Sequence, residues 1–107
     1  MKRGELWSIA GGGDYAGKPR PALILQIDEV AEIGSVLACL LTSTDEDFRL
    51  RPLLMPSADN GLRSASWAMV DKMQAVPRAK FGQRIGRLEP DLLRQVERAL
   101  LYLLGLG

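Results

Sequence analysis

The sequence predicts a mainly β fold (α+β): a small, partly open barrel of curved antiparallel strands with an α-helix at its C-terminal end. Short apolar runs alternate with turn signals over most of the chain, which is typical of strands. After residue 90 the apolar residues recur at helical spacing instead. The chain has 107 residues, enough for one core, and we expect residues 1–107 to form a single domain.

The first half of the chain predicts three strands. Leu6–Ile9 has the aromatic and β-branched content of a strand, and the following Gly11-Gly12-Gly13-Asp14 run cannot continue it. We therefore expect a loop over residues 10–19. Pro21–Ile27 and Ser35–Leu41 are short apolar runs between turn signals, and their length favours core strands over helices.

The second half predicts three more strands. Leu50–Met55 contains Pro52, which has no amide donor for a sheet ladder, so we expect this segment at a sheet edge or a bulge. Ser66–Val70 and Gln74–Val76 have strand composition, and Asn60-Gly61 is a turn signal before them.

The end of the chain predicts one amphipathic helix of about four turns. Pro90 suits the first helical turn, Asp91 suits the positive end of the helix dipole, and Gly105 follows the last turn. We expect the apolar face to pack on the sheet. That face consists of Leu92, Leu93, Val96, Ala99, Leu100, Leu103 and Leu104.

Several classes of protein are excluded by composition. The longest apolar runs, such as Ala99–Leu104, fall far short of the roughly 20 residues that cross a bilayer. Lys2 and Arg3 are followed by Gly4 and Glu5 rather than by the apolar core of an export signal. The single cysteine, Cys39, allows no internal disulfide, so we expect a cytoplasmic protein.

Charge is unevenly distributed although the net charge is only +1. Residues 21–48 carry six acids and no base, whereas residues 49–87 carry eight bases and two acids, a local charge of eight minus two, or +6. Such segregation is compatible with one basic face for a phosphate backbone. The alternative is that these charges interleave with the acids in space, because clustering in sequence is not clustering on a surface.

The residue inventory limits the chemistry. With no histidine and one cysteine, a Ser-His-Asp triad, a Cys-His nucleophile and a zinc site of the usual ligands are excluded. Asp45, Glu46 and Asp47 are a weak candidate for Mg²⁺, since three consecutive acids cannot all point at one ion. No nucleotide-binding motif is present, because the Gly11–Gly13 run lacks the Lys-Ser/Thr and helix that cradle phosphate. We therefore expect neither a metal nor a cofactor.

The remaining Arg, Lys, Thr, Ser and Tyr residues suit one reaction class. In cleavage of RNA by its own 2′-hydroxyl, the substrate supplies the nucleophile, and the protein has only to align it and stabilise charge on the phosphoryl oxygens. A guanidinium group is suited to this because its donors meet two oxygens at once.

Six segments match the order and spacing of motifs in a known family. They are Arg3-Gly4-Glu5-Leu6-Trp7, Gly17 to Leu25, Leu40-Leu41-Thr42-Ser43, Asn60-Gly61-Leu62, Ser66 to Lys72 and Ile85-Gly86-Arg87-Leu88. Together they resemble the MazF/PemK toxins over nearly the whole chain. The resemblance implies an SH3-like barrel and the toxin of a type II toxin–antitoxin system. Such a toxin is a sequence-specific, metal-independent endoribonuclease (mRNA interferase) acting on single-stranded RNA. The resemblance also implies that it forms a homodimer and binds a cognate antitoxin.

The resemblance also implies the catalytic residues, Arg20 and Thr42. We expect Arg20 to stabilise charge rather than transfer a proton, because guanidinium keeps its proton to a pKa above about 12. Without the resemblance, Arg20 would be a surface residue entering a strand. Thr42, with Ser43 and Thr44, would be a cluster that satisfies turn backbone groups.

Two departures from the family leave the RNA sequence preference open. Asp14-Tyr15 stands where the family has Glu-Gln, and Lys72 stands where Gln is common. Tyr15 either stacks on an unpaired base or lies on the barrel, and Asp14 is the candidate general base. The expected RNA-binding residues are Asp14, Tyr15, Lys18, Pro19, Ser43, Thr44, Lys72 and Arg78.

Two functions other than RNA cleavage are alternatives for such a barrel. CcdB-like toxins share the fold and poison DNA gyrase without catalysis, but they use a C-terminal Trp-Gly-Ile tail. This chain ends Leu104-Gly105-Leu106-Gly107 and has no tryptophan after Trp67. A non-catalytic barrel that binds nucleic acid or peptide would follow if Arg20 and Thr42 lay far apart.

Trp7 and Trp67 are candidates for core or dimer contacts.

Overall fold

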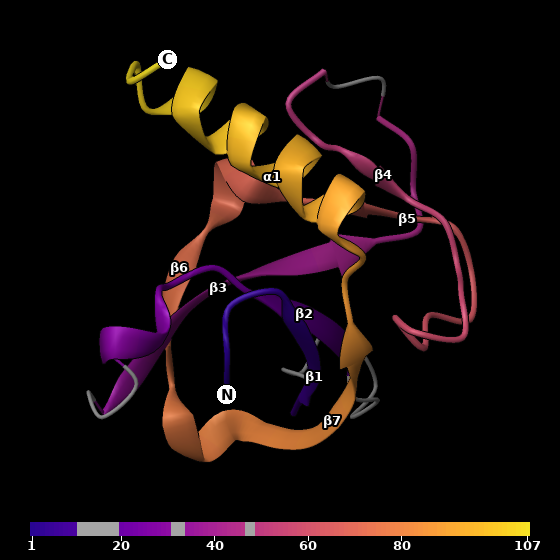
Figure 1. The fold of residues 1–107 in the computed structure, drawn as a ribbon. Coiled ribbons are helices and arrows are strands. Elements are labelled where there is room, and N and C mark those ends of the chain that lie inside the picture. Colours follow the sequence, from indigo (N-terminus) through magenta and orange to yellow (C-terminus); the bar gives the residue numbers. More distant parts are fainter. Residues whose placement is uncertain (11–19, 31–33, 47–48) are drawn as a thin grey trace.

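The protein forms one curled antiparallel sheet with a helix lying across one side of it (Figure 1). The structure is a computed structural model that describes residues 1–10, 20–30, 34–46 and 49–107. Within these ranges the elements are β1 (Glu5–Ile9), β2 (Arg20–Ile24), β3 (Ser35–Thr42), β4 (Leu53–Leu54), β5 (Ser66–Ala68), β6 (Gln74–Pro77), β7 (Phe81–Arg87) and α1 (Pro90–Leu103). Single 3₁₀ turns span Asp28–Val30, Val70–Lys72 and Arg78–Lys80.

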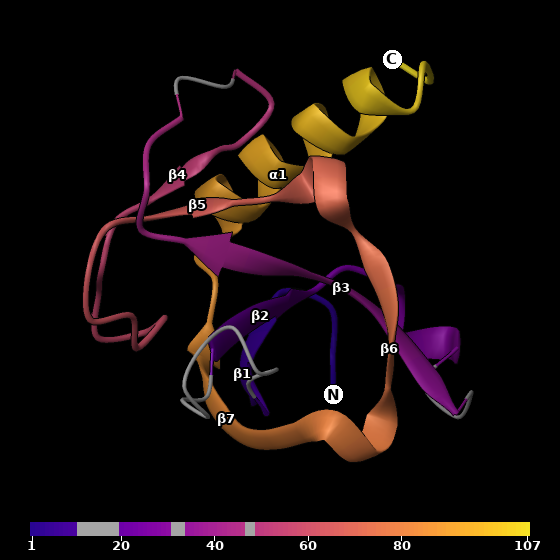
Figure 2. The same cartoon turned by 180° about the vertical axis from the view of Figure 1, so that it is seen from behind.

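Strand β3 is the central strand of this sheet, whose order is β4-β5-β3-β2-β1-β7 with β6 also paired to β3. One edge of β3 pairs with β2, from Ala38 to Leu40. The other edge pairs with β6 over Ser35–Ala38 and then with β5 at Leu41 and Thr42. Figure 2 shows β3 crossing the molecule between these partners. The predicted fold, a mainly β barrel of curved antiparallel strands with a C-terminal helix, is confirmed.

The strand side chains alternate between two apolar clusters, as a period of two requires. On β2, Leu23 packs in the cluster under the helix, together with Val96 of α1. Ala22 and Ile24 point the other way, into a second cluster that Trp7 partly covers. Trp7 and Trp67 are both half-buried, and Trp7 packs against the second cluster.

The predicted C-terminal helix is confirmed, and so are the positions at which it begins and ends. Pro90 opens the helix, and Gly105 follows it with φ of +73°. The Gly105 and Leu106 N–H groups donate to Tyr102 O and Leu101 O, at 3.1 and 2.8 Å, which is a Schellman motif. No helix in the described part of the chain is long and apolar enough to cross a membrane.

Three predicted strands are longer than the observed ones. Strand β2 ends at Ile24 rather than residue 27, because the Gln26 side chain, not its backbone, accepts the Leu37 N–H at 2.8 Å. The segment 50–55 shortens to β4, which lies at the sheet edge as Pro52 predicts. The segment 66–70 ends at Ala68, where a 3₁₀ turn carries the chain toward β6. The other three predicted strands agree within one residue at each end.

Strand β7 has no counterpart among the sequence predictions, since its glycines and charges interrupt any apolar alternation. Its two glycines allow close approach of other segments. A Cβ at Gly82 would lie 2.7 Å from Ser8 Oγ, and one at Gly86 would lie 2.4 Å from Asn60 O. The barrel therefore closes tightly against β7 only because these residues have no side chain.

Asn60 fixes the segment between β4 and β5. Its side chain is fully buried, and its Oδ1 accepts the N–H groups of Ser57 and Leu62, both at 3.0 Å. Its Nδ2 donates to Met55 O at 2.9 Å and to Glu89 Oε1 at 3.1 Å. Since Glu89 is the N-cap of α1, one buried amide joins this segment to the start of the helix.

Replacement of Asn60 should strongly destabilise the fold. Asn60→Ala leaves the buried Leu62 N–H and its neighbours without their acceptor, and we expect the free energy of unfolding to fall by about 3 kcal/mol. Urea unfolding measures this. The control is Asp59→Ala at the exposed neighbouring position, which should stay within about 0.5 kcal/mol of the parent. Equal losses in both variants would contradict this role of Asn60.

Candidate active site

The sheet brings the two predicted catalytic residues together. Strands β2 and β3 pair with Ala22 opposite Leu40, and continuing this register by two residues brings Arg20 opposite Thr42. The Arg20 guanidinium crosses to β3, where its Nη2 donates to Leu41 O at 2.9 Å. The condition for a non-catalytic barrel, a wide separation of Arg20 and Thr42, is therefore not met.

Arg20 and Thr42 share a surface pocket of about 550 Å³. It lies where β2 begins and β3 ends, over the 3₁₀ turn that follows β5. The lining includes two basic side chains, a run of three hydroxyls and one acid. The residues are Arg20, Leu40, Thr42, Ser43, Thr44, Glu46, Met69, Lys72 and Gln74.

The Thr42 hydroxyl has a structural contact. Its Oγ1 accepts the Thr44 N–H at 3.1 Å, a short turn in which a side chain satisfies the backbone. Thr42 therefore has the turn-stabilising role that is expected of it without the family resemblance. It uses the oxygen only as an acceptor, so the hydroxyl proton remains available to donate to a ligand. Ser43 and Thr44 are exposed beside it.

A largely buried ion pair lies next to Lys72, which lines the pocket. Arg51, whose side chain is 5% exposed, donates to both carboxylate oxygens of Asp71, at 2.9 and 3.0 Å. Its Nη1 lies 3.6 Å from Glu46 Oε2. Arg51 thus connects two walls of the pocket, because Glu46 lines one wall and Lys72, next to Asp71, lines another.

The ionisation of these groups follows from their contacts. The hydrogen bonds from Arg51 lower the pKa of Asp71, and the same bonds raise the pKa of Arg51. Burial, with a smaller contribution from the negative charge of Asp71, raises the pKa of Cys39 to about 12. The Cys39 thiol therefore stays protonated at neutral pH and is no thiolate nucleophile.

The other predicted RNA-binding residues do not all reach this pocket. Arg78 lies beside Gly34, to whose carbonyl its N–H donates at 3.0 Å. Gly34 precedes the start of β3 whereas Thr42 is its last residue, so Arg78 is roughly 20 Å or more away along the strand. Four predicted residues, Asp14, Tyr15, Lys18 and Pro19, lie outside the described residues.

The basic segment 49–87 does not form a single face. Arg51 is buried against Asp71 and Glu46, and Arg84 pairs with Glu5 at 2.9 Å on the β1–β7 side. Arg49 borders a separate hollow together with Gln95 and Arg98 of the helix. Several of these bases instead interleave with acids in space, as the alternative expectation from the sequence has it.

Two pocket residues were missed by the reasoning from sequence. From the sequence, Glu46 is only a weak candidate for a metal ligand and Gln74 only a strand residue. Gln74 lines the pocket because β6 pairs with β3, and Glu46 lines it beside Arg51, whose Nη1 lies 3.6 Å from Glu46 Oε2. Among the described residues, no three His, Cys, Asp or Glu side chains lie close enough to hold a metal ion.

Comparison with known proteins assigns the family. A family model described as the PemK-like, MazF-like toxin of type II toxin–antitoxin systems matches residues 2–104. The chain belongs to this family. The MazF/PemK resemblance seen in the sequence is thereby confirmed.

Curated relatives of this MazF-like chain are named as ribonucleases. A probable endoribonuclease MazF of Mycolicibacterium smegmatis is 42% identical over 109 residues, covering 100% of this chain and 99% of the relative. A probable endoribonuclease MazF2 of Mycobacterium tuberculosis is 36% identical over 102 residues, covering 94% of each. The expected class of enzyme, an endoribonuclease toxin, agrees with both.

Solved structures share the fold. A mycobacterial endoribonuclease in complex with its cognate antitoxin superposes with a TM-score of 0.82 at 21% identity, covering 100% of this chain and 97% of that one. A MazE–MazF complex from Deinococcus radiodurans gives a TM-score of 0.79 at 23% identity, with the same coverage. At these identities the two structures show that this chain shares their fold.

The Arg51–Asp71 pair should weaken in acid. Because the folded-state pKa of Asp71 is lowered, its contribution to stability is complete above the ordinary carboxyl pKa and is lost as the pH falls through the folded value. We expect a double-mutant cycle with Arg51→Met and Asp71→Asn to give a coupling of about 2 kcal/mol at pH 7. That coupling should shrink steadily below about pH 4. A coupling that stays constant down to pH 2 would show that the Asp71 charge contributes nothing.

Proposed function

We propose that this chain is the toxin of a type II toxin–antitoxin pair and cuts single-stranded RNA at selected sequences without a metal ion. The observation that carries the proposal is the contact between β2 and β3. The Arg20 guanidinium lies 2.9 Å from Leu41 O, beside Thr42, and both catalytic candidates line one open pocket. Family membership and the relatives' names support the same reading.

The reaction needs only groups that this pocket can supply. The 2′-oxygen of the nucleotide before the cut attacks phosphorus and loses its proton. The bond from phosphorus to the 5′-oxygen breaks, and that oxygen gains a proton. The products are a 2′,3′-cyclic phosphate and a 5′-hydroxyl end. Since the nucleophile belongs to the substrate, the protein contributes alignment and charge stabilisation.

Arg20 is proposed to hold the scissile phosphate. Its planar fork of donors suits two phosphoryl oxygens, where negative charge grows in the transition state. The bond to Leu41 O fixes the guanidinium against β3 before RNA arrives, so little reorganisation is needed on binding.

The hydroxyl run and Lys72 are proposed as the remaining phosphate contacts of the pocket. Thr42 donates its hydroxyl proton to a phosphoryl oxygen while its Oγ1 keeps the bond from Thr44. Ser43, Thr44 and Lys72 contact the backbone on either side. Asp14 remains the candidate general base, with Tyr15, Lys18 and Pro19 beside it in the chain, and Arg78 is assigned to a more distant phosphate.

The partners follow from the same reading. We infer a homodimer in the cytoplasm and an antitoxin that lays an acidic or apolar segment over the pocket. Two cationic side chains, Arg20 and Lys72, line the pocket and would attract such a segment. The similar solved structures with antitoxin support the existence of such a partner.

The first test is cleavage of a long single-stranded RNA by the pure protein in EDTA. We expect sequence-selective cuts with 2′,3′-cyclic phosphate or 3′-phosphate ends and 5′-hydroxyl ends. Arg20→Ala should lose about a hundredfold or more in rate, as other donors to a charged transition state do. Arg20→Lys should be intermediate, because it keeps the charge but loses the fork.

The matched control is Arg87→Ala, an exposed arginine at the far end of β7, which should cut like the parent. If the parent protein leaves RNA intact, the ribonuclease proposal is wrong, and a toxin that binds its target without catalysis becomes the better reading.

Thr42 offers a second test, with variants of similar shape. Thr42→Ser retains the hydroxyl and should keep most activity. Thr42→Val fills the same volume without it and should lower kcat and kcat/KM together, by at least about tenfold. Melting temperatures of the two variants show whether loss of the turn bond from Thr44 perturbs the fold. Full activity in Thr42→Val would remove Thr42 from the site.

A further inference from the structure

A second hollow lies on the other side of Arg20. It has a volume of about 470 Å³ and is bordered by β1, β2, β7 and the segment between β4 and β5. Arg20 lines both this hollow and the pocket that contains Thr42. An RNA strand held at Arg20 by its scissile phosphate therefore has a cavity on each side of that phosphate.

The lining of the second hollow differs from that of the first. Pro21, Leu62 and Ile85 provide apolar walls, and Arg63 and Ser64 provide polar groups. Its volume falls within the range of about 300–1,000 Å³ that is usual for small-ligand sites. Apolar walls with a few polar groups suit a flat nucleobase, whereas a phosphate gains nothing from three apolar side chains.

The segment that carries Arg63 is held at both ends by buried polar residues. On one side the Leu62 N–H donates to the fully buried Asn60 at 3.0 Å. On the other side Ser66, which is 6% exposed, donates its hydroxyl to Ser64 O at 3.1 Å. Arg63 is thus presented by an ordered segment, as a residue that reads a ligand requires.

The turn before Arg63 is fitted closely to β7. Gly61 has φ of +69°, and a Cβ there would lie 2.4 Å from Ile85 O. This contact sets the floor of the hollow, because Gly61 and Ile85 both line it.

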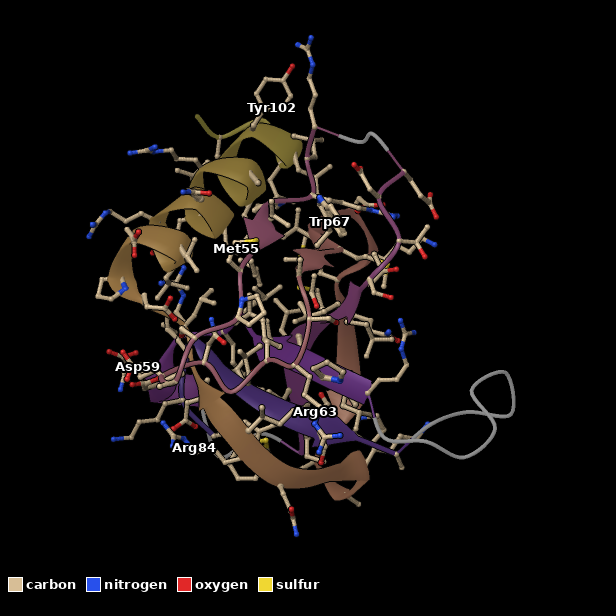
Figure 3. All side chains as sticks on the ribbon, turned by 90° about the vertical axis from the view of Figure 1, so that its right-hand side faces the viewer. Met55, Asp59, Arg63, Trp67, Arg84 and Tyr102 are labelled. Atoms are coloured by element: carbon tan, nitrogen blue, oxygen red, sulfur yellow. The ribbon has the colours of Figure 1, made fainter. Side chains whose placement is uncertain are left out.

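Arg63 itself is available to a ligand. Its side chain is exposed, and none of the ion pairs within the described residues involves it. Figure 3 shows it lying against the body of the molecule above β7, whereas Tyr102 projects from the end of the helix. Arg84, on the same side, is instead paired with Glu5.

We propose that the second hollow binds the base of a nucleotide next to the cut, and that Arg63 selects that base by hydrogen bonding to its edge. This proposal rests on the ribonuclease function proposed above. The guanidinium fork favours a base that presents two acceptors, as guanine does with O6 and N7. Arg63 would then be a specificity residue, not a catalytic one.

The test is cleavage of an RNA library with a randomised segment, in EDTA, with the ends sequenced. The parent is compared with Arg63→Ala, Arg63→Lys and the control Arg87→Ala. We expect both Arg63 variants to lose about tenfold or more of the preference at one position beside the cut, with the other positions unchanged. Arg63→Lys should fail to restore it, because lysine keeps the charge but not the fork.

A uniform loss of cleavage over all sequences that Arg63→Lys restores would indicate a phosphate contact and overturn the proposal. An unchanged preference in Arg63→Ala would also overturn it. A parallel selection of binders from a randomised 2′-O-methyl RNA library separates this proposal from the ribonuclease function, because that RNA has no free nucleophile. Base preference that depends on Arg63 in this selection would support the subsite even if the parent cut nothing, and its absence there would count against it.

Discussion

The central position of strand β3 is the constraint on which the rest of the structure depends. Its backbone is paired with β2 on one edge and with β6 and then β5 on the other. A strand held on both edges cannot shift its register without reversing the faces of its side chains. The position of Thr42 at its end, and of Leu41 O under the Arg20 guanidinium, is therefore fixed by the whole sheet. The candidate active site is preorganised because it is built where the pairings of β3 with β2 and with β5 meet.

The fold could be predicted from sequence where a period or a cap is local. The helix follows from the spacing after Pro90 and from Gly105, and both bounds are found in the structure. Strand β7 could not be predicted from the sequence. Its residues Gly82 and Gly86 are required by close packing against Ser8 and Asn60, which are distant in sequence. The end of β2 was missed for a related reason, since the Gln26 side chain replaces a backbone partner of Leu37. Neither close packing of this kind nor a side chain that takes the place of a backbone hydrogen-bond partner produces a periodic pattern in the sequence.

The candidate site was predictable in part. Family resemblance singled out Arg20 and Thr42, and the register of β2 and β3 brings them together. Gln74, Glu46 and the hollow at Arg63 depend on which loops lie side by side, and no local motif marks them. Arg78 shows the opposite error: its proximity in sequence to Lys72 gives no proximity in space, because β6 carries it to the other end of β3.

The arginines of this chain show why charge counted along a sequence is a poor guide to a binding surface. Arg51 is committed to Asp71 and Glu46, so its charge is neutralised inside the fold and it serves to hold two walls of the pocket. Arg84 is committed to Glu5. Arg20 donates from Nη2 to the backbone of β3, and it lines both the pocket that contains Thr42 and the second hollow. Arg63 is exposed at the second hollow. The chemistry open to each guanidinium is set by the acceptors that the fold places around it, and a nearly neutral protein can therefore keep the cationic groups Arg20 and Lys72 in one pocket.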